Sequence, residues 1–236
     1  MLDHAVQWME IVESVADALL LVRILALRLN RLYTFFTLFC LLNVAFDVIA
    51  WWLGWDSPAN VRVSAYAQFL FAVVFPLVAW DIFEEVKTQA AKLRRLRAPR
   101  LVSGVMLSLI FGLIMTAALD DKDFNGMSSE AVFVGLVMWV GSATTSLLFV
   151  WFVYKGVRSQ NSEIPNNTPV LSFYVLGMLA LAILECAFSF FEFNPVVHNV
   201  LRLVFEFLDL VITTWCTVRL KSLQSDVPSA PEKASL

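Results

Sequence analysis

The sequence predicts an all-α integral membrane protein, a bundle of seven transmembrane helices with the N-terminus outside and the C-terminus in the cytoplasm. Three observations carry this prediction: 59% of the 236 residues are hydrophobic, only 16% are charged, and the mean hydropathy is +0.74. Soluble domains average about 45–50% apolar and about 25% charged residues, so the apolar surplus is expected to face lipid. At about 20–25 residues per crossing, the chain is long enough for seven helices joined by short loops.

The helices are expected to fill residues 1–221 as one transmembrane domain. Residues 222–236 are polar, contain two prolines and are expected to form a disordered cytoplasmic tail. Six apolar runs predict helices directly. A seventh run, nearest the N-terminus, is interrupted by acidic residues. The seven expected helices span about 5–27, 33–54, 60–83, 101–119, 131–154, 169–191 and 196–218.

The first expected helix is the least secure, and two arrangements stay open for it. Residues 5–27 either cross the membrane or lie along its inner surface, and both arrangements satisfy the distribution of basic residues. The stretch 16–27 is apolar except for Asp17 and Arg23, and a surface helix usually carries a basic face and not an acidic one. The spanning arrangement is therefore favoured.

Basic residues set the expected orientation, because Lys and Arg concentrate in the cytoplasmic loops of membrane proteins. Three of the seventeen lie on the side predicted to be outside: Arg62, Lys122 and Arg202. The other fourteen lie near the connections between helices one and two, three and four, and five and six, and in the C-terminal region: Arg23, Arg28, Arg31, Lys87, Lys92, Arg94, Arg95, Arg97, Arg100, Lys155, Arg158, Arg219, Lys221 and Lys233. The expected location is the cell (inner) membrane.

Charge and motif content argue against several classes of protein. Seventeen basic and twenty acidic residues give a net charge of −3, which leaves no basic excess for a nucleic acid. The sequence has no Gly-x-Ser-x-Gly elbow, P-loop or dinucleotide-binding fingerprint, so we expect no enzyme and no cofactor. Its two histidines, His4 and His198, are too few for a seven-helix zinc hydrolase, and no lysine lies mid-helix to bind retinal.

The last expected helix carries a continuous polar face. Its polar residues are spaced by 4, 4, 3, 4 and 3 positions, which is helical spacing: His198, Arg202, Glu206, Asp209, Thr213 and Cys216. At roughly 1.5 Å per residue, Glu206 lies about 15 Å from the start of the helix, near the middle of a hydrocarbon core about 30 Å thick. Ionisable groups are costly at this depth, and each is a default functional candidate.

Acidic residues on three other expected helices complete a candidate site. The simplest arrangement points their polar faces at one another and forms an acidic cavity that opens outward. The candidate substrate or proton site consists of Asp17, Asp47, Glu185, Arg202, Glu206 and Asp209. Five acids around a single arginine cannot all be ionised, so some are expected to be protonated at neutral pH.

A structural interpretation of the same residues stays open. A buried Arg202–Glu206 pair could hold helices together through interhelical hydrogen bonds, with help from Asn43. Five acids on four helices favour a functional cavity instead. Three further acids are expected to be hydrated at the outer interface: Glu10, Glu13 and Glu192.

These observations lead to ranked function hypotheses. The first is a small permease or a binding protein for a cation or a protonatable solute. The alternative is a non-enzymatic sensory or accessory subunit that acts through a partner protein, with the basic stretch 87–100 as the contact. The third hypothesis is a structural subunit without a ligand.

Two features concern helix packing. Pro76 leaves the carbonyl of Ala72 without its helical donor and is expected to kink the third helix. The fourth expected helix has a row of small residues, which indicates either a contact within the chain or a homodimer seam: Gly104, Ser108, Gly112 and Thr116.

Overall fold

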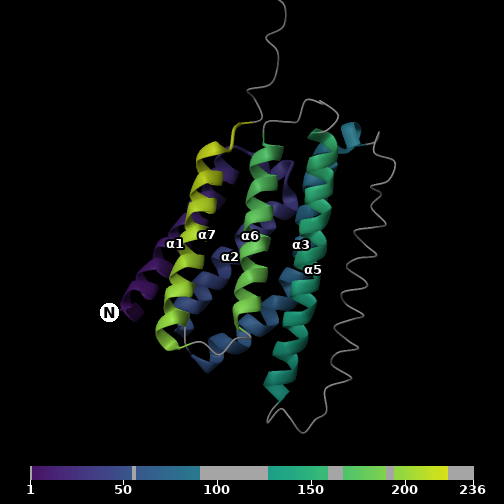
Figure 1. Ribbon diagram of the computed structural model, residues 1–236. Helices are drawn as coiled ribbons and strands as arrows, with labels where there is room; N and C mark the ends of the chain where they lie inside the picture. Colours follow the sequence, from purple (N-terminus) through teal and green to yellow (C-terminus); the bar gives the residue numbers. More distant parts are fainter. Residues whose placement is uncertain (1, 55–56, 91–126, 159–166, 190–193, 223–236) are drawn as a thin grey trace, which may run out of the picture.

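The computed structural model describes residues 2–54, 57–90, 127–158, 167–189 and 194–222 (Figure 1). Within these ranges the chain forms six α-helices, one short 3-10 helix and no β-strand, which confirms the all-helical prediction for them. The α-helices are α1 (Leu2–Ala26), α2 (Thr34–Leu53), α3 (Pro58–Ala90), α5 (Met127–Arg158), α6 (Thr168–Ser189) and α7 (Pro195–Arg219). The expected helix at 101–119, including Gly104, Ser108, Gly112 and Thr116, lies outside the described residues.

The described helices form a bundle in which some helices are antiparallel to the others. In Figure 1, α1, α3, α5 and α7 run upward, whereas α2 and α6 run downward. Hydrogen bonds agree with this arrangement: Arg23 near the end of α1 donates to the carbonyl of Leu220 after α7, at 3.2 Å. We call the end where α1 and α7 finish the upper end, and the end where they begin the lower end.

Aromatic rings and aliphatic side chains fill the space between the helices. The ring of Phe36 meets that of Tyr174 edge-on, with 5.4 Å between centroids, so α2 packs against α6. The rings of Phe39 and Phe75 lie 6.0 Å apart between centroids in a tilted arrangement and join α2 to α3. Such ring pairs stabilise packing beyond the apolar area that they bury. The result is one core to which all six described α-helices contribute.

A side chain of α5 provides the hydrogen bond that a carbonyl of α3 lacks because of Pro76. Proline at position 76 lacks an N–H, so the carbonyl of Ala72 one turn earlier has no helical donor. The hydroxyl of Ser142 on α5 donates a hydrogen bond to this carbonyl, and both groups are buried. An unpaired carbonyl in an apolar interior is costly, so Ser142 stabilises the α3–α5 interface.

Replacement of Ser142 is therefore expected to cost stability. Ser142→Ala should lower the free energy of unfolding by about 1–3 kcal/mol, because the buried carbonyl of Ala72 loses its donor. Thermal or denaturant unfolding of the purified protein measures this loss. Ser146→Ala is a matched control one turn later on α5, since the Ser146 hydroxyl is buried without a hydrogen-bond partner among the described residues. Equal stability of the two variants would contradict the role assigned to Ser142.

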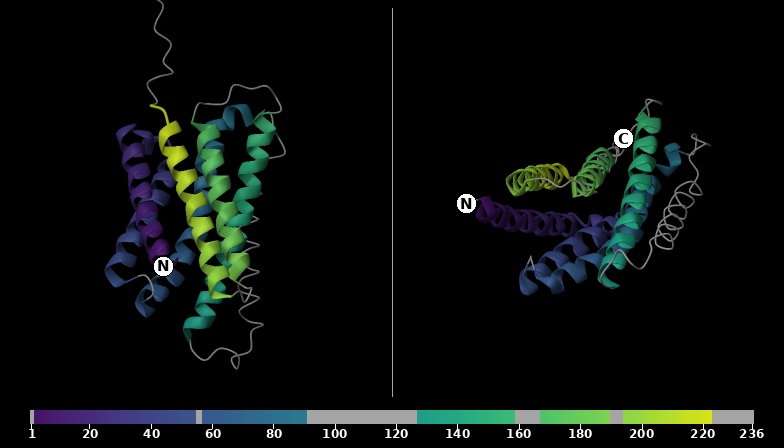
Figure 2. Two further views of the ribbon diagram at one scale, coloured as in Figure 1. Left: turned by 60° about the vertical axis from the view of Figure 1, so that its left-hand side comes forward. Right: turned by 60° about the horizontal axis from the view of Figure 1, so that its bottom comes forward.

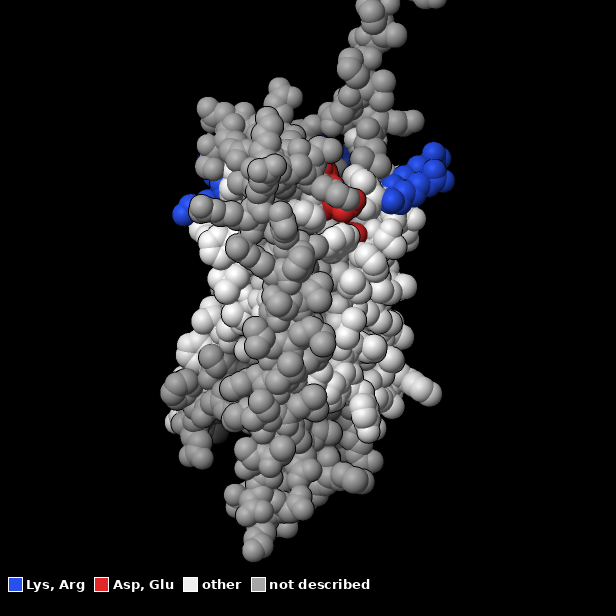
Figure 3. Space-filling model, turned by 90° about the vertical axis from the view of Figure 1, so that its right-hand side faces the viewer, with Lys and Arg blue, Asp and Glu red and all other residues white. Residues whose placement is uncertain are grey.

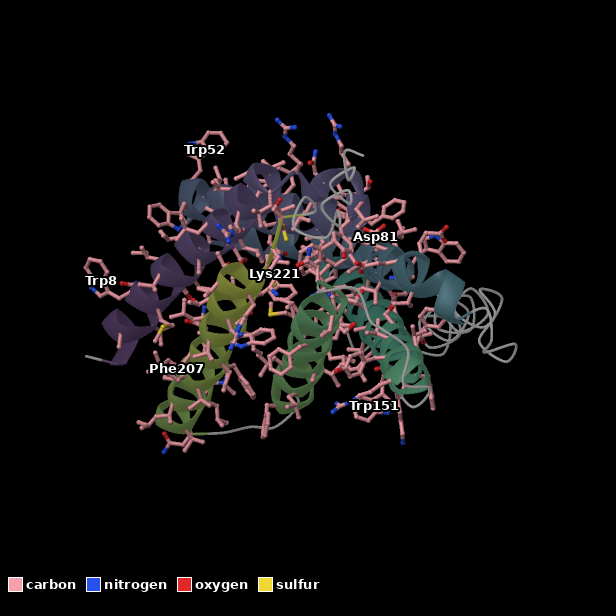
Figure 4. The ribbon with its side chains drawn as sticks, turned by 90° about the horizontal axis from the view of Figure 1, so that it is seen from above. Trp8, Trp52, Asp81, Trp151, Phe207 and Lys221 are labelled. Carbon is pink, nitrogen blue, oxygen red and sulfur yellow. The ribbon has the colours of Figure 1, made fainter. Side chains whose placement is uncertain are left out.

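Polar contacts tie the helices together at the upper end, which Figure 4 shows from above. Lys221 N donates to Asn167 Oδ1 at 2.9 Å, and Asn167 Nδ2 donates to the Lys221 carbonyl at 3.0 Å. These two bonds join the start of α6 to the end of α7. Asp81 on α3 accepts from the backbone N–H groups of Phe35 and Phe36, at 2.7 and 2.9 Å, and so caps the start of α2.

By length, every described α-helix suffices for a membrane crossing. The shortest has 20 residues, which at about 1.5 Å per residue covers a hydrocarbon core about 30 Å thick. By length and apolar composition together, one described helix, α2, meets the requirement. Charged side chains reduce the hydropathy of α1 and α7, and several of them belong to the candidate site. The all-helical character is thus confirmed for the described residues, whereas a membrane bundle of seven crossings is not confirmed.

Candidate functional site

A cavity of about 230 Å³ lies among α1, α2, α6 and α7. The α6 side of its wall is apolar, with Met178 and Ala182. Gly177 beside them allows α6 to approach α7 closely, because a Cβ at this position would lie 2.8 Å from Ile212 Cδ1. The rest of the wall includes five carboxyl groups and one guanidinium group: Glu10, Glu13, Asp47, Arg202, Glu206 and Asp209.

The polar faces of α1 and α7 lie against each other. On α1, Glu10, Glu13 and Asp17 are three or four positions apart and share one face. The equivalent face of α7 carries Arg202, Glu206 and Asp209, which are also three or four positions apart. The two helices run in parallel and contact each other along their length (Figure 2). Residues at equal heights therefore meet, and the two faces form one wall of the cavity.

Arg202 joins the two helices through carboxyl groups. Its guanidinium is paired with Glu10 on α1, and its Nε lies 3.1 Å from Glu206 Oε1 one turn along α7. The side chain of Glu10 is 6% exposed and that of Glu206 is 13% exposed, whereas Arg202 is 37% exposed. The arginine thus sits at the rim of the cavity, nearer to the surroundings than its carboxyl partners.

Replacement of Arg202 is expected to destabilise the protein moderately. Arg202→Ala should lower the free energy of unfolding by about 1–2 kcal/mol, because Glu10 stays in a buried position without this counter-charge. A fully buried ion pair would cost about 3–5 kcal/mol when broken, and the exposure of Arg202 reduces that figure. Arg219→Ala, at the exposed end of α7, is the control in the same unfolding measurement. Equal melting temperatures would show that the Arg202 ion pairs contribute nothing.

The carboxyl groups also contact one another deeper in the bundle. Glu13 and Asp209 lie within hydrogen-bonding reach of each other, and two carboxyl groups form a hydrogen bond only when one of them carries a proton. The hydroxyl of Thr213 donates to Asp209 Oδ1 at 3.1 Å and is also within hydrogen-bonding reach of Asp17. Because a hydroxyl has one proton to donate, Thr213 satisfies one of these two acids at a time.

Asp17 is the most enclosed of the predicted site residues whose side chains the structure describes. Its side chain is 8% exposed, and its Oδ1 has no hydrogen-bond partner among the described residues. A carboxylate oxygen in such a position is costly unless a proton or a cation accompanies it. Asp17 lines a second cavity, of about 220 Å³, which lies beside the first and shares Glu13, Asp47 and Asp209 with it.

The structure brings together five of the six residues predicted from the sequence. Arg202 and Glu206 line the first cavity, Asp17 lines the second, and Asp47 and Asp209 line both. The sixth, Glu185, belongs to α6, and its side chain lies outside the described residues.

Two acids of α1 lie in the candidate site, although the sequence did not predict them there. Glu10 and Glu13 were expected to be hydrated at the outer interface, yet Glu10 is buried and paired with Arg202, and Glu13 contacts Asp209. The signal was present in the spacing of these residues with Asp17. What the sequence does not show is that α1 lies directly beside α7.

Among the described residues, no group of three or more His, Cys, Asp or Glu side chains is arranged to hold a metal ion. Comparison of the chain with protein-family models, with curated proteins and with solved structures finds no match.

Proposed function

We propose that the chain is an integral membrane protein of seven crossings that binds a small cation or a protonatable solute in its acidic cavity, as a permease or a binding protein. The observation that carries the proposal is the grouping of five carboxyl groups around one guanidinium in a single cavity. Excess negative charge in an enclosed space attracts cations and protons. Two like charges 4 Å apart repel by about 4 kcal/mol even at an effective dielectric constant of about 20.

The outer surface of the bundle supports a membrane location. Large apolar side chains point away from the helices in Figure 4, among them Trp8 (68% exposed), Trp52 (86%) and Phe207 (53%). On the face in Figure 3, the described Lys, Arg, Asp and Glu side chains gather near the upper end, and the described surface below them is uncharged. Apolar patches of this extent are unfavourable in water and favourable against lipid.

The position of the cavity supports access from outside. Glu10 and Arg202 both lie in the first half of their helices, which begin at the lower end. Hydrogen bonds of Asn167, Lys221 and Arg23 join the helices at the upper end. The distribution of basic residues predicts that the upper end faces the cytoplasm. A solute would therefore enter from the outer side.

Isothermal titration calorimetry of the purified protein in lipid nanodiscs tests this proposal. Sodium chloride, ammonium chloride and benzylammonium chloride serve as probes at neutral pH, each in two buffers with different ionisation enthalpies. We expect saturable binding of at least one probe, with a buffer-dependent heat that reports released protons, because a bound cation replaces protons shared by the acids. Absence of saturable binding for all three probes would contradict the proposal.

A further inference from the structure

The second cavity differs from the first in the chemistry of its wall. Its wall includes aromatic side chains from three helices, α2, α3 and α5: Phe39, Phe46, Phe71, Phe75 and Trp139. Its wall also includes the carboxyl groups of Glu13, Asp17, Asp47 and Asp209. The second cavity therefore adjoins the acidic cavity through shared lining residues, and its wall combines aromatic rings with carboxyl groups.

The aromatic side chains form one connected wall. Phe71 lies at its centre, with its ring 5.8 Å from Phe39, 5.5 Å from Phe46 and 5.9 Å from Phe75 between centroids. The ring of Phe75 meets Trp139 edge-on at 5.8 Å. Contacts at these distances hold the rings in fixed relative positions. A ligand in this cavity would meet a preformed aromatic surface.

Asp17 is one of the four acids at this cavity. Its buried Oδ1 lacks a hydrogen-bond partner among the described residues, so a donor from a ligand would satisfy it. Asn43, which also lines the cavity, adds a neutral amide that can donate and accept. The geometry thus offers a charged anchor for one end of a ligand and an apolar surface for the rest.

We infer that the ligand is an organic ammonium cation, with its nitrogen near Asp17 and Asp209 and its apolar part against the aromatic wall. A proton or an inorganic cation would gain little from five rings, whereas a substituted ammonium group is attracted to ring faces and also buries its carbon atoms. Each cavity alone is smaller than the roughly 300–1,000 Å³ typical of sites for organic ligands, and the two together reach that range. This inference rests on the proposed function and specifies its ligand class.

Calorimetric titration with a series of ammonium salts tests the inference. Ammonium, methylammonium, tetramethylammonium and benzylammonium chlorides carry the same charge with increasing apolar area. We expect the affinity of the wild-type protein to rise along the series, by about tenfold or more from ammonium to benzylammonium. Binding of ammonium or sodium as tight as that of benzylammonium would overturn the inference while leaving the proposed function in place. Failure of every cation to bind would contradict both.

Variants of the wall separate an aromatic role from a general packing role. Trp139→Leu and Phe71→Leu should each weaken benzylammonium binding by about tenfold and leave the binding of ammonium nearly unchanged. Trp139→Phe keeps a ring and should retain most of the affinity. Phe173→Leu is the control, because Phe173 is an exposed residue of α6 that contacts Trp215 at 4.6 Å and lines neither cavity. Equal benzylammonium affinity in Trp139→Leu and Phe173→Leu, both folded by circular dichroism, would overturn the inference.

Discussion

The Glu206→Gln variant is expected to lose cation binding by tenfold or more while it keeps a stability close to that of the unmodified protein. Glu206 lines the acidic cavity beside Arg202, and its side chain is 13% exposed. Glutamine has nearly the same size and still accepts a hydrogen bond from Arg202, but it carries no charge. If the cavity holds a cation, the substitution removes one of the negative charges that stabilise the bound cation. If Glu206 only links helices, the change should cost about 1 kcal/mol or less of stability and leave binding intact.

Calorimetric titration with benzylammonium chloride measures this difference, together with thermal unfolding of each variant. Glu84→Gln is the matched control, since Glu84 is exposed near the upper end of α3 and lines neither cavity. Cation affinity that is unchanged in Glu206→Gln at every pH tested would contradict the acidic-cavity proposal. The hypothesis of an accessory subunit that acts through a partner protein would then take its place.

The largest loss of stability is expected for Asp81→Ala. The carboxylate of Asp81 is buried and accepts the N–H groups of Phe35 and Phe36 at the start of α2, where Tyr33 provides no side-chain cap. Its removal leaves two backbone donors unsatisfied and removes a negative charge from a helix N-terminus. We expect a loss of about 2–4 kcal/mol in the free energy of unfolding.

Denaturant unfolding of Asp81→Ala, with Glu84→Ala as the control three residues later, checks this expectation. Asp81→Asn should fall between the two, because an amide oxygen still accepts hydrogen bonds but without a full charge. An Asp81→Ala variant as stable as Glu84→Ala would show that water or a rearranged side chain caps α2 instead.

The polar face of α7 could be predicted from sequence because helical spacing alone defines it. Arg202, Glu206 and Asp209 recur at intervals of three and four, and no knowledge of neighbouring helices is needed to place them on one side. The same applies to Asp17 on α1. The sequence also predicts the freed carbonyl of Ala72, since Pro76 removes its donor whatever the surroundings.

Contacts between distant segments could not be predicted in this way. Glu10 and Arg202 are 192 positions apart, and their pairing depends on α1 lying parallel to α7. Asp81 caps α2 from 46 positions away. The aromatic wall gave no signal either, because phenylalanine in an apolar helix is equally compatible with lipid, with the core and with a cavity. The ring of Phe71 differs from exposed rings only through the tertiary packing that surrounds it.

The most direct test of the central claim is an infrared difference spectrum of the carboxyl groups, recorded at neutral pH with and without saturating benzylammonium. Glu13 and Asp209 lie within hydrogen-bonding reach of each other, and Asp17 Oδ1 is buried without a partner among the described residues. We expect the cation to remove part of the protonated-carboxyl band of the wild-type protein. We expect a smaller loss in Asp17→Asn and in Glu206→Gln. A band that is identical with and without the cation would contradict the claim that these acids form a cation site.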